Sequence, residues 1–421
     1  MQQEKPKADL VIANAGQVIT CNGKGPEGLG MADGGWIAVS GEHIAAVGSR
    51  AEVAAVVDME QSFTIDASGK VVVPGFVDCH THAVFGGSRV KEYAARMTTD
   101  SPERLKLMGI ETGIHASVEM TRKASEEELC QSARERLLRM LRSGTTTVEI
   151  KSGYGLTTKD EIKMLNVSAR LAKELPVDIV STFLGAHGWP RNLSKEMYIS
   201  VLIEEMIPWV RELGLAQACD VWCDDGHFTV EESARILEAG MNAGLAPKIH
   251  TDAYSYIGGS DLAADMGMAS ADHLNYTPER VMRNLADAGV TGVLMPALDF
   301  AVKHPRPFNA RALIDSGMTV ALATNLCPGC WTESMQLVMV LACRLYQMTP
   351  AEALVAATIG GAKALRLDRD RGSIECGKLA DLQIWDVPSY EHVIYRLGGN
   401  VVDQVVKRGK VVVNLMDTRG R

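Results

Sequence analysis

Val71–His82 reads VVVPGFVDCHTH, and the fold and chemistry of the chain can be inferred outward from this stretch. An apolar run typical of a β-strand is interrupted by Pro74-Gly75, resumes, and ends in polar residues. Side chains alternate along an extended segment, so His80 and His82 are expected to point the same way. Two imidazoles at one strand end form half of a zinc-type site. The spacing alone also fits an alternative in which the two histidines lie on the surface or in the core and bind no ion.

The same pattern of an apolar strand with a polar end recurs along the chain. Strands are expected at residues 73–82, 145–151, 178–186, 218–224, 246–251, 268–273, 289–295 and 319–325. Helical stretches intervene, including residues 125–144, 159–175, 229–244 and 349–365. About eight β/α units are the number that closes a parallel barrel. The sequence therefore predicts an α/β fold built on a (β/α)8 TIM-type barrel.

Both ends of the chain differ from the middle in their predicted secondary structure. Residues from about 9 to 73 consist of short strand-like runs separated by Gly, Asn and Ser, and the C-terminal runs GKLADLQIWDV and VVDQVVKRGKVVVN repeat this pattern. We therefore predict a small composite β-sandwich domain from residues 1–73 plus 371–421. Residues 74–370 are predicted to form the barrel.

Composition narrows the classes of function. The chain has 421 residues, 46% of them hydrophobic, and a formal net charge of −9. This balance gives no global attraction to nucleic acid or to an anionic membrane, so an anionic substrate must be held by local cations.

The N-terminal MQQEKPKADL has no apolar signal core, and no stretch approaches the length of a membrane span. Nine cysteines, an odd number, are typical of reduced thiols. We predict a cytoplasmic protein.

Histidines gather at the predicted strand ends, which converge on one mouth of a parallel barrel. Five of the ten histidines occupy such positions, namely His80, His82, His187, His250 and His273. An ion held by His80, His82 and His250 would keep an open position for water. His273 and His187 are then placed to move protons or to bond the substrate, although His187 has the alternative of a purely structural role.

Two further residues near the predicted mouth could bind a substrate. Arg89 follows Gly86-Gly87 and offers a planar fork that fits a carboxylate, although an exposed arginine is by default only solvated. Tyr154 follows the second predicted strand and either bonds the substrate or caps the rim of the barrel.

Several motifs in fixed order carry a family resemblance. PGFVDCHTHAVFGGSR, VEIKSGYGL, TFLGAHGWP, KIHTD, SADHLNYTP and ALATNLCPG resemble the amidohydrolase superfamily and, within it, the imidazolonepropionases of histidine breakdown. The resemblance runs through nearly the whole chain. It implies a distorted β/α barrel with a composite β-sandwich domain, one divalent ion that is zinc or alternatively iron, and a homodimer.

The resemblance also implies a reaction and a set of roles. In that family the residues matching His80, His82 and His250 bind the metal, and the residue matching His273 lies beside the reaction centre. Substrate contacts are implied for the residues that match Arg89, Tyr154 and His187. The reaction is hydrolysis of a small-molecule carboxylate, 4-imidazolone-5-propanoate, to N-formimino-L-glutamate.

The chain departs from the family pattern at two carboxylates. The family reads His-Ala-Asp-Glu after strand five, whereas this chain reads His250-Thr251-Asp252-Ala253. After strand eight the family has an Asp that binds metal and accepts a proton from water, and here the residue is Asn325. An amide oxygen can still touch a metal, but it cannot act as a general base at neutral pH.

Other residues could replace the missing base. The family's Gly-Gly-Gly-Ile run is Glu111-Thr112-Gly113-Ile114 here and is followed by His115, so Glu111 and His115 are candidates for substrate contact or proton transfer. Asp252 and a thiolate of Cys327 or Cys330 are the remaining candidates for the base. Asn325 stays a candidate metal ligand and catalytic residue.

Three hypotheses remain open. The chain is an imidazolonepropionase with a variant base, or a relative acting on a 2-oxo or 2-thioxo imidazolidinone-propionate as a hydantoinase-like enzyme or a desulfhydrase, or a non-catalytic protein that binds a metal and a ligand. Retention of Arg89, Tyr154, His187 and His273 favours a propionate-bearing ring and opposes the third hypothesis. The missing carboxylates favour altered chemistry.

Overall fold

The computed structural model describes residues 5–33, 35–99, 101–306 and 308–415. Its largest sheet has eight strands that follow one another in chain order, every neighbouring pair parallel. These are β8 (Phe76–Asp78), β9 (Thr145–Lys151), β10 (Asp178–Ala186), β11 (Ala218–Cys223), β12 (Ala246–Thr251), β13 (Ser270–His273), β14 (Thr291–Leu294) and β15 (Val320–Leu322). The predicted TIM-type barrel is confirmed.

The barrel closes beyond the ends of its two edge strands. The Asn325 amide donates to the His80 carbonyl at 3.1 Å, and the His82 amide donates to the Leu326 carbonyl at 2.8 Å. These bonds join the segment after β8 to the segment after β15. The distortion of the barrel therefore lies at the point where the first two histidines enter the site.

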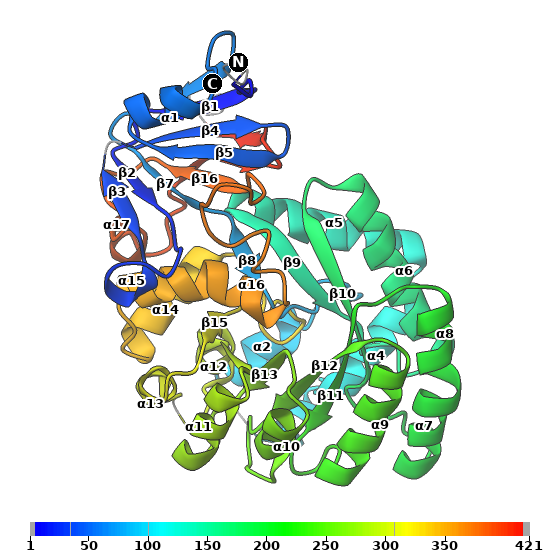
Figure 1. Cartoon of the computed structure of the whole chain (residues 1–421). Helices are drawn as coiled ribbons and strands as arrows, with labels where there is room; N and C mark the ends of the chain where they lie inside the picture. The colour runs from blue at the N-terminus through cyan, green and yellow to red at the C-terminus, as the bar shows by residue number, and fades with distance from the viewer. Residues whose placement is uncertain (1–4, 34, 100, 307, 416–421) are drawn as a thin grey trace.

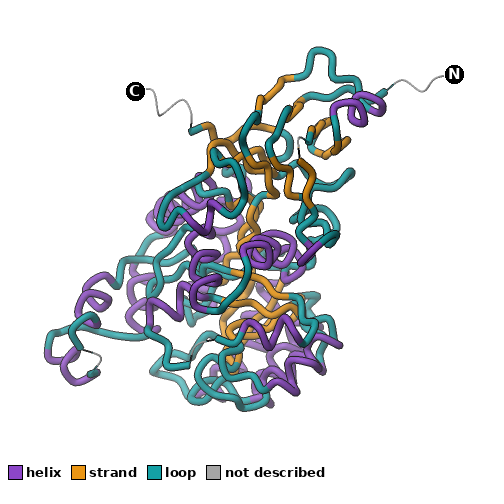
Figure 2. The backbone as a smooth tube through the Cα atoms, turned by 90° about the vertical axis from the view of Figure 1, so that its left-hand side faces the viewer, coloured by secondary structure: helices purple, strands orange, loops and turns teal. Residues whose placement is uncertain are grey.

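Helices surround the barrel sheet (Figures 1 and 2). The helices between β8 and β15 are α2 (Val90–Arg96), α3 (Pro102–Leu107), α4 (Ile114–Lys123), α5 (Glu126–Arg142), α6 (Thr158–Glu174), α7 (Lys195–Val201), η2 (Leu202–Met206), α8 (Ile207–Glu212), α9 (Val230–Asn242), α10 (Gly259–Asp265), α11 (Glu279–Asp287), α12 (Pro296–Val302) and α13 (Ala310–Asp315). After β15 follow α14 (Met335–Leu345), α15 (Pro350–Val355), η3 (Ala356–Gly360), α16 (Gly361–Ala364) and α17 (His392–Tyr395).

Local capping explains where several of the predicted helices begin. Ser125, Thr229 and Thr349 each accept a bond from the backbone three residues on, and the Glu at that third position bonds back to the cap. Such reciprocal bonds satisfy two amides that would otherwise lack a partner at a helix start. The helix starts at 126, 230 and 350 lie within a few residues of those expected from the sequence.

Two further sheets lie at one end of the barrel (Figure 1): strands from both termini form the six-stranded one, and N-terminal strands alone form the four-stranded one. One has the order β18-β17-β16-β7-β2-β3 and the other β5-β4-β1-β6. Their strands are β1 (Leu10–Ala13), β2 (Gln17–Ile19), β3 (Met31–Asp33), β4 (Trp36–Ser40), β5 (His43–Gly48), β6 (Phe63–Asp66), β7 (Val71–Pro74), β16 (Leu382–Trp385), β17 (Val402–Lys407) and β18 (Lys410–Asn414), with η1 (Pro26–Gly28) and α1 (Arg50–Val56) between them. The composite β-region is confirmed, whereas its boundaries at 73 and 371 stay a prediction.

The expected first strand, residues 73–82, is wrong as a single element. β7 pairs with β16 of the terminal sheets, and only β8 belongs to the barrel. The two are separated by Gly75, where an added Cβ would collide with the side chain of Thr146. The chain therefore changes sheet at this glycine, and His80 and His82 follow β8 in a segment without regular structure.

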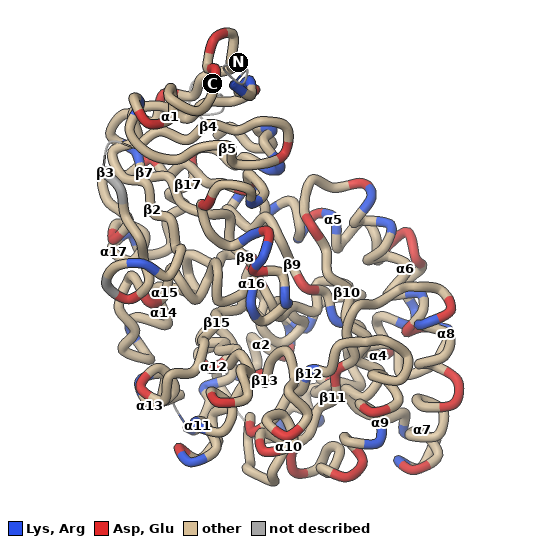
Figure 3. Tube along the Cα trace, viewed as in Figure 1, with Lys and Arg blue, Asp and Glu red and all other residues tan. Residues whose placement is uncertain are grey.

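Charged residues of both signs are interspersed along the outer helices α5 to α9 (Figure 3). Within the described residues, no helix combines the length and apolar character needed to cross a bilayer.

Candidate metal centre and substrate cavity

A cavity of about 430 Å³ opens at the carboxyl ends of the barrel strands. The aromatic and apolar residues Trp222, Tyr254 and Leu298 form part of its wall. Eight of the residues singled out from the sequence also line it, namely His82, Arg89, Tyr154, His187, His250, His273, Asn325 and Cys327. The convergence of strand ends therefore brings most of the predicted residues to one place.

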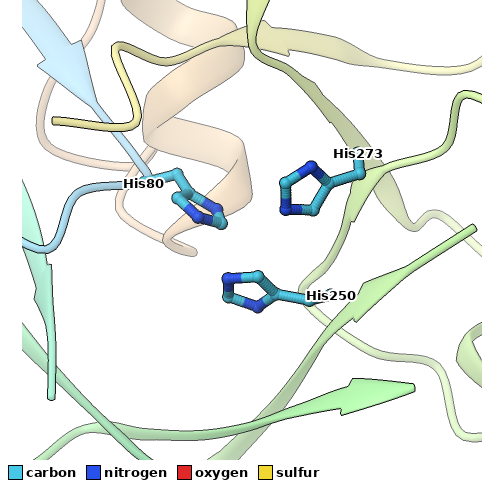
Figure 4. A group of neighbouring side chains, drawn as sticks. All are labelled: His80, His250 and His273. Carbon is cyan, nitrogen blue, oxygen red and sulfur yellow. The ribbon is translucent and has the colours of Figure 1, made fainter. Parts of the chain in front are cut away.

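The imidazoles of His80, His250 and His273 face one another, and the last two line the cavity (Figure 4). The ring centroid of His80 lies 4.5 Å from that of His250 and 5.6 Å from that of His273. One nitrogen of each ring lies within 4.8 Å of the others. His82, His187 and His250 form a second such group.

His250 is the member common to both groups of histidines. The sequence predicted His80, His82 and His250 as one set of ligands. Among the described residues, no group of three donors within 4.8 Å of one another contains both His80 and His82. Their ring centroids lie 5.4 Å apart, and both residues follow β8 in a segment without regular structure.

Buried carboxylates fix the orientation of two of these imidazoles. His80 Nδ1 lies 2.6 Å from Asp272 Oδ2, and His250 Nδ1 lies 3.0 Å from Asp220 Oδ1. An ionised carboxylate can only accept, so each Nδ1 carries the hydrogen and each Nε2 carries a free lone pair. Neither Nε2 has a hydrogen-bond partner among the described residues, although both atoms are buried.

This donor set fits a zinc-type ion. A buried polar atom without a partner is costly, and metal-binding histidines typically donate their other nitrogen to a carboxylate. Burial, reinforced by the nearby Lys151 charge, holds the pKa of His80 and of His250 well below the usual value, so both rings are neutral and able to bind an ion. Imidazole nitrogens suit zinc, iron, copper and nickel.

A buried ion-pair cluster underlies the two oriented imidazoles. Lys151 Nζ lies 2.7 Å from Asp220 Oδ2, 3.0 Å from Glu149 Oε2 and 3.4 Å from Asp272 Oδ2. Lys248 Nζ lies 2.8 Å from Glu149 Oε1. Burial raises the pKa of Asp220 and the Lys151 charge opposes that rise, whereas the pKa of Asp272 is lowered because Lys151 and Lys248 outweigh its burial.

Sequence reasoning missed most of this cluster. Glu149 and Lys151 stand two apart in β9, and Lys248 stands two before His250 in β12. Residues two apart in a strand share a face. Charged residues that repeat at this interval in an otherwise apolar barrel strand were the available signal.

Arg89, which the sequence suggested as a binding site for a substrate carboxylate, is already paired with a carboxylate of the protein itself. Arg89 Nε and Nη2 each donate to Glu92 at 2.7 Å, and Arg96 Nε donates to the same carboxylate at 3.0 Å. All three residues line the cavity together with Lys303. One carboxylate among three cations leaves this side of the cavity positively charged.

Tyr154 and Asn325 lie on the cavity wall as predicted. Burial raises the pKa of Tyr154 well above its usual value, so the phenol stays protonated and can donate a hydrogen bond. Asn325 has a left-handed backbone with φ of 48° and is 5% exposed. Its carboxamide occupies the place where the family resemblance expected a carboxylate.

Three candidates for the missing base do not reach the cavity. Asp252 is turned into the protein, where it accepts bonds from the hydroxyls of Thr251, Ser260 and Thr277 at 2.9, 2.6 and 2.6 Å. Its side chain is fully buried, and it is not among the described residues that line the cavity. The other two, Glu111 and His115, are not among the described residues that line the cavity.

The two thiols after Asn325 are also unsuited to act as bases. Cys327 lines the cavity, while Cys330 Sγ lies 4.0 Å from the carbonyl of Thr324. Burial raises the pKa of both thiols above the usual value of 9.0. Both are therefore thiols at neutral pH rather than thiolates.

The amidohydrolase family matches residues 215–412 of this chain. The chain is similar to imidazolonepropionase of Alkaliphilus metalliredigens, with 42% identity over 416 residues that cover 96% of this chain and 98% of the relative. It is 44% identical over 418 residues to imidazolonepropionase of Geobacillus kaustophilus, covering 96% and 98%. Imidazolonepropionase of Halobacterium salinarum is 42% identical over 411 residues, again covering 96% and 98%.

Solved structures show the same architecture at lower identity. A zinc-bound adenosine deaminase from Xanthomonas campestris superposes with a TM-score of 0.74 at 21% identity, covering 98% of this chain and 94% of that one. Atrazine chlorohydrolase from Arthrobacter aurescens, complexed with zinc, superposes with a TM-score of 0.68 at 18% identity, covering 96% and 95%. These similarities concern the fold.

Proposed function

Since this chain belongs to the imidazolonepropionase family of amidohydrolases, we propose that it is a metal-dependent hydrolase that opens the ring of 4-imidazolone-5-propanoate to give N-formimino-L-glutamate. The observation that carries the proposal is the pair of buried, partnerless Nε2 atoms of His80 and His250, each oriented by a carboxylate on its other nitrogen. We propose one zinc ion, with iron as the alternative. A homodimer and a cytoplasmic location are further proposals from the same resemblance.

Ring opening adds water across the cyclic amide. The water oxygen bonds to the ring carbonyl carbon, the bond from that carbon to the neighbouring ring nitrogen breaks, and the nitrogen takes up a proton. A bound zinc-type ion supplies Lewis-acid chemistry and lowers the pKa of water toward ~7. His80 and His250 would hold the ion, with His82 as the third ligand implied by the family.

His273 is the residue best placed to move the proton. It lines the cavity, and its ring centroid lies 5.2 Å from that of His250. Burial lowers its pKa to about 4 despite the opposing charge of Asp272, so the ring is neutral near pH 7 and can accept a proton from water. It can then return that proton to the departing nitrogen.

The charge on the Arg89 side of the cavity supports binding of the propionate. Arg89 Nη1 makes none of the bonds to Glu92 and lies near Gly329 at the cavity wall. A guanidinium that is already held in place by one carboxylate loses little freedom when it binds a second. Tyr154, which lines the same cavity, can donate a hydrogen bond to the substrate.

A second function is favoured by one observation. Among the described residues that line the cavity, Glu92 is the one carboxylate, and it is paired with Arg89 and Arg96. A reaction that depends less on a carboxylate base would suit this site. A 2-thioxo or 2-oxo imidazolidinone bearing a propionate is the matching alternative substrate, with loss of sulfide from the thioxo compound.

Turnover of both ring types by the zinc-loaded protein tests the proposal. We expect loss of the ring absorbance of imidazolone-propanoate together with formation of N-formimino-glutamate. Release of sulfide from the 2-thioxo compound with no opening of the imidazolone would favour the alternative. Binding of zinc without turnover of either compound would contradict both functions.

Asn325→Asp sharpens the same test, because it restores the carboxylate expected from the family. We expect this variant to increase kcat on imidazolone-propanoate if the missing base limits the rate, since a positioned base typically contributes ~10²–10⁴-fold. Asn325→Ala is the control for altered shape. An equal loss in both variants would show that the carboxamide itself is needed.

A further inference from the structure

Lys151 is a fully buried cation below the histidines, and neither the proposed reaction nor the family resemblance uses it. Its side chain is 0% exposed, as are those of the three carboxylates it faces, Glu149, Asp220 and Asp272. Its backbone amide also donates to the Thr81 carbonyl at 2.9 Å, between the two histidines that follow β8. The cation thus lies at the centre of the strands that carry the metal-binding residues.

A buried ion cluster of this kind contributes little to the stability of the folded protein. Removing charges from water costs several kcal/mol per ion, and well-packed apolar residues of similar volume are often equally stable in their place. A protein can retain this desolvation cost where the buried charges hold other functional groups in position. Asp220 and Asp272 are such charges, because each accepts the Nδ1 hydrogen of one imidazole.

Lys151 is the element that joins these two carboxylates. Asp220 accepts from His250 Nδ1 with one oxygen and from Lys151 with the other, at 3.0 and 2.7 Å. Asp272 Oδ2 lies 2.6 Å from His80 Nδ1 and 3.4 Å from Lys151 Nζ. One ammonium group therefore spans the two carboxylates, which belong to β11 and β13 on either side of His250.

We propose that Lys151 is a positioning residue of the metal centre: its ammonium group holds Asp220 and Asp272 in the orientation that turns His250 Nε2 and His80 Nε2 toward one ion. The inference rests on the metal centre of the proposed function. It assigns Lys151 an effect on metal affinity that arises without any contact between Lys151 and the ion.

Lys248 provides a matched comparison within the same cluster. It is 1% exposed, and its ammonium group contacts Glu149 at 2.8 Å and the Cys79 carbonyl at 3.3 Å. The structure records no ion pair or hydrogen bond from it to Asp220 or Asp272 among the described residues. Loss of Lys248 therefore removes a buried charge, which also lowers the pKa of Asp272, without breaking a bond to either carboxylate that orients an imidazole.

The test compares Lys151→Met with Lys248→Met in the full-length protein. Zinc affinity is measured by competition with a chromophoric chelator, and unfolding of the metal-free protein by denaturant. Since loss of a residue that orients a metal ligand typically costs about 10–100-fold in affinity, we expect this loss in Lys151→Met and little change in Lys248→Met. The absorption spectrum of the cobalt-loaded protein should change in Lys151→Met alone.

A double variant separates positioning from charge balance. Lys151→Met combined with Glu149→Gln restores the net charge of the cluster and keeps both histidine-orienting carboxylates. Positioning predicts that zinc affinity stays low in the double variant. Recovery of affinity would overturn the proposal, as would unchanged affinity in Lys151→Met or an equal loss in Lys248→Met.

Two remaining outcomes are also decisive. If neither Lys151 variant gives a cooperative unfolding transition, Lys151 serves the core rather than the metal centre and the proposal fails. If the parent protein binds no zinc, the proposed function loses its metal centre. Zinc binding by the parent with no effect of Lys151→Met would overturn this inference alone.

Discussion

Strand β10 begins and ends in opposite electrostatic surroundings. Asp178, its first residue, accepts bonds from Arg371 and Lys407 at 2.6 and 2.8 Å and from Arg408 at 3.1 Å. We call these four residues the interface cluster, because Asp178 belongs to the barrel and the three cations come from the C-terminal part of the chain. His187 follows the last residue of β10 and is buried, and no described residue bonds its Nδ1.

The difference shows how the two ends of one barrel serve different purposes. In the interface cluster every charged group has a partner, since the three cations also pair with Asp370, Asp381 and Glu42. The cluster keeps contact with water, because the side chain of Asp178 is 23% exposed. The opposite end, which we call the histidine end, consists of His80, His82, His187, His250 and His273, and it leaves buried nitrogen atoms unpaired. Mutations at the interface cluster should change stability, whereas mutations at the histidine end should change metal binding.

The largest effect is expected from loss of the imidazole shared by both histidine groups. His250→Ala should weaken zinc binding by more than the roughly 10–100-fold that loss of an outer carboxylate costs, because a ligand itself is removed. Isothermal titration with zinc measures the effect, and Arg408→Ala at the interface cluster is the control. Equal zinc affinity in His250→Ala and in the parent protein would show that the histidine end does not bind the metal.

Isosteric loss of charge should separate the two ends of the barrel. Asp272→Asn takes away the acceptor that orients His80, so zinc affinity is expected to fall by about 10–100-fold. Asp178→Asn removes a carboxylate with at least as many cationic partners, yet zinc affinity should not change. A similar decrease in both variants would mean that the two regions are not independent.

Acid should affect the histidine end first. Burial lowers the pKa of His187 to about 3 and of His273 to about 4, both from the usual 6.5. The unfolded chain therefore takes up protons below pH 6.5 while the folded chain does not, so the metal-free protein should lose stability as the pH falls from 6.5 to about 4. Denaturant unfolding at a series of pH values measures this loss.

The interface cluster should respond only to stronger acid. Burial acts against ionisation of Asp178, but Lys407, Arg371 and Arg408 hold its pKa below the usual 3.8. Its contribution is therefore complete above about pH 5 and is lost as the pH falls through 3.8 and below. Asp178→Asn should shift the whole curve between about pH 6.5 and 5 downward without changing its slope. A changed slope in this range would contradict the assignment of the titration to the histidine end.

The smallest effects are expected within the interface cluster itself. Asp178→Asn should lower the free energy of unfolding by ~1.5–3 kcal/mol, the usual value of a hydrogen bond to a charged group. Arg408 is 37% exposed, so Arg408→Ala should cost about 1 kcal/mol or less. Thermal unfolding of the zinc-loaded variants compares them. An Arg408→Ala effect as large as that of Asp178→Asn would show that exposure does not weaken this ion pair.

Much of the fold could be inferred from local patterns. Apolar runs with polar ends marked all eight barrel strands, because parallel barrel strands are buried on both faces and their carboxyl ends meet at one mouth. Caps such as Ser125 and Thr349 marked helix starts, since the residues that satisfy a helix terminus lie within four positions of it. Six of the proposed site residues followed from the same strand-end argument and line the cavity, as does Arg89, which was proposed from its place after Gly86-Gly87.

The places where prediction failed depend on contacts that no local pattern contains. The strand expected at 73–82 is two strands, because Val71–Pro74 pairs with Leu382–Trp385 from the far end of the chain. Asp252 sits at a strand end, but three hydroxyl partners hold its carboxylate inside the protein, and two of them lie 8 and 25 positions along the chain.

The sequence by itself determined which chemical groups are present, including the histidines of the strand ends and the absence of a carboxylate at positions 253 and 325. The tertiary structure decided which nitrogen of each imidazole is free. The acceptor that orients His80 is Asp272, which lies 192 positions away. Such a bond forms only after the barrel has brought β8 and β13 together, and its physical effect is to leave the buried Nε2 lone pair of His80 free for an ion.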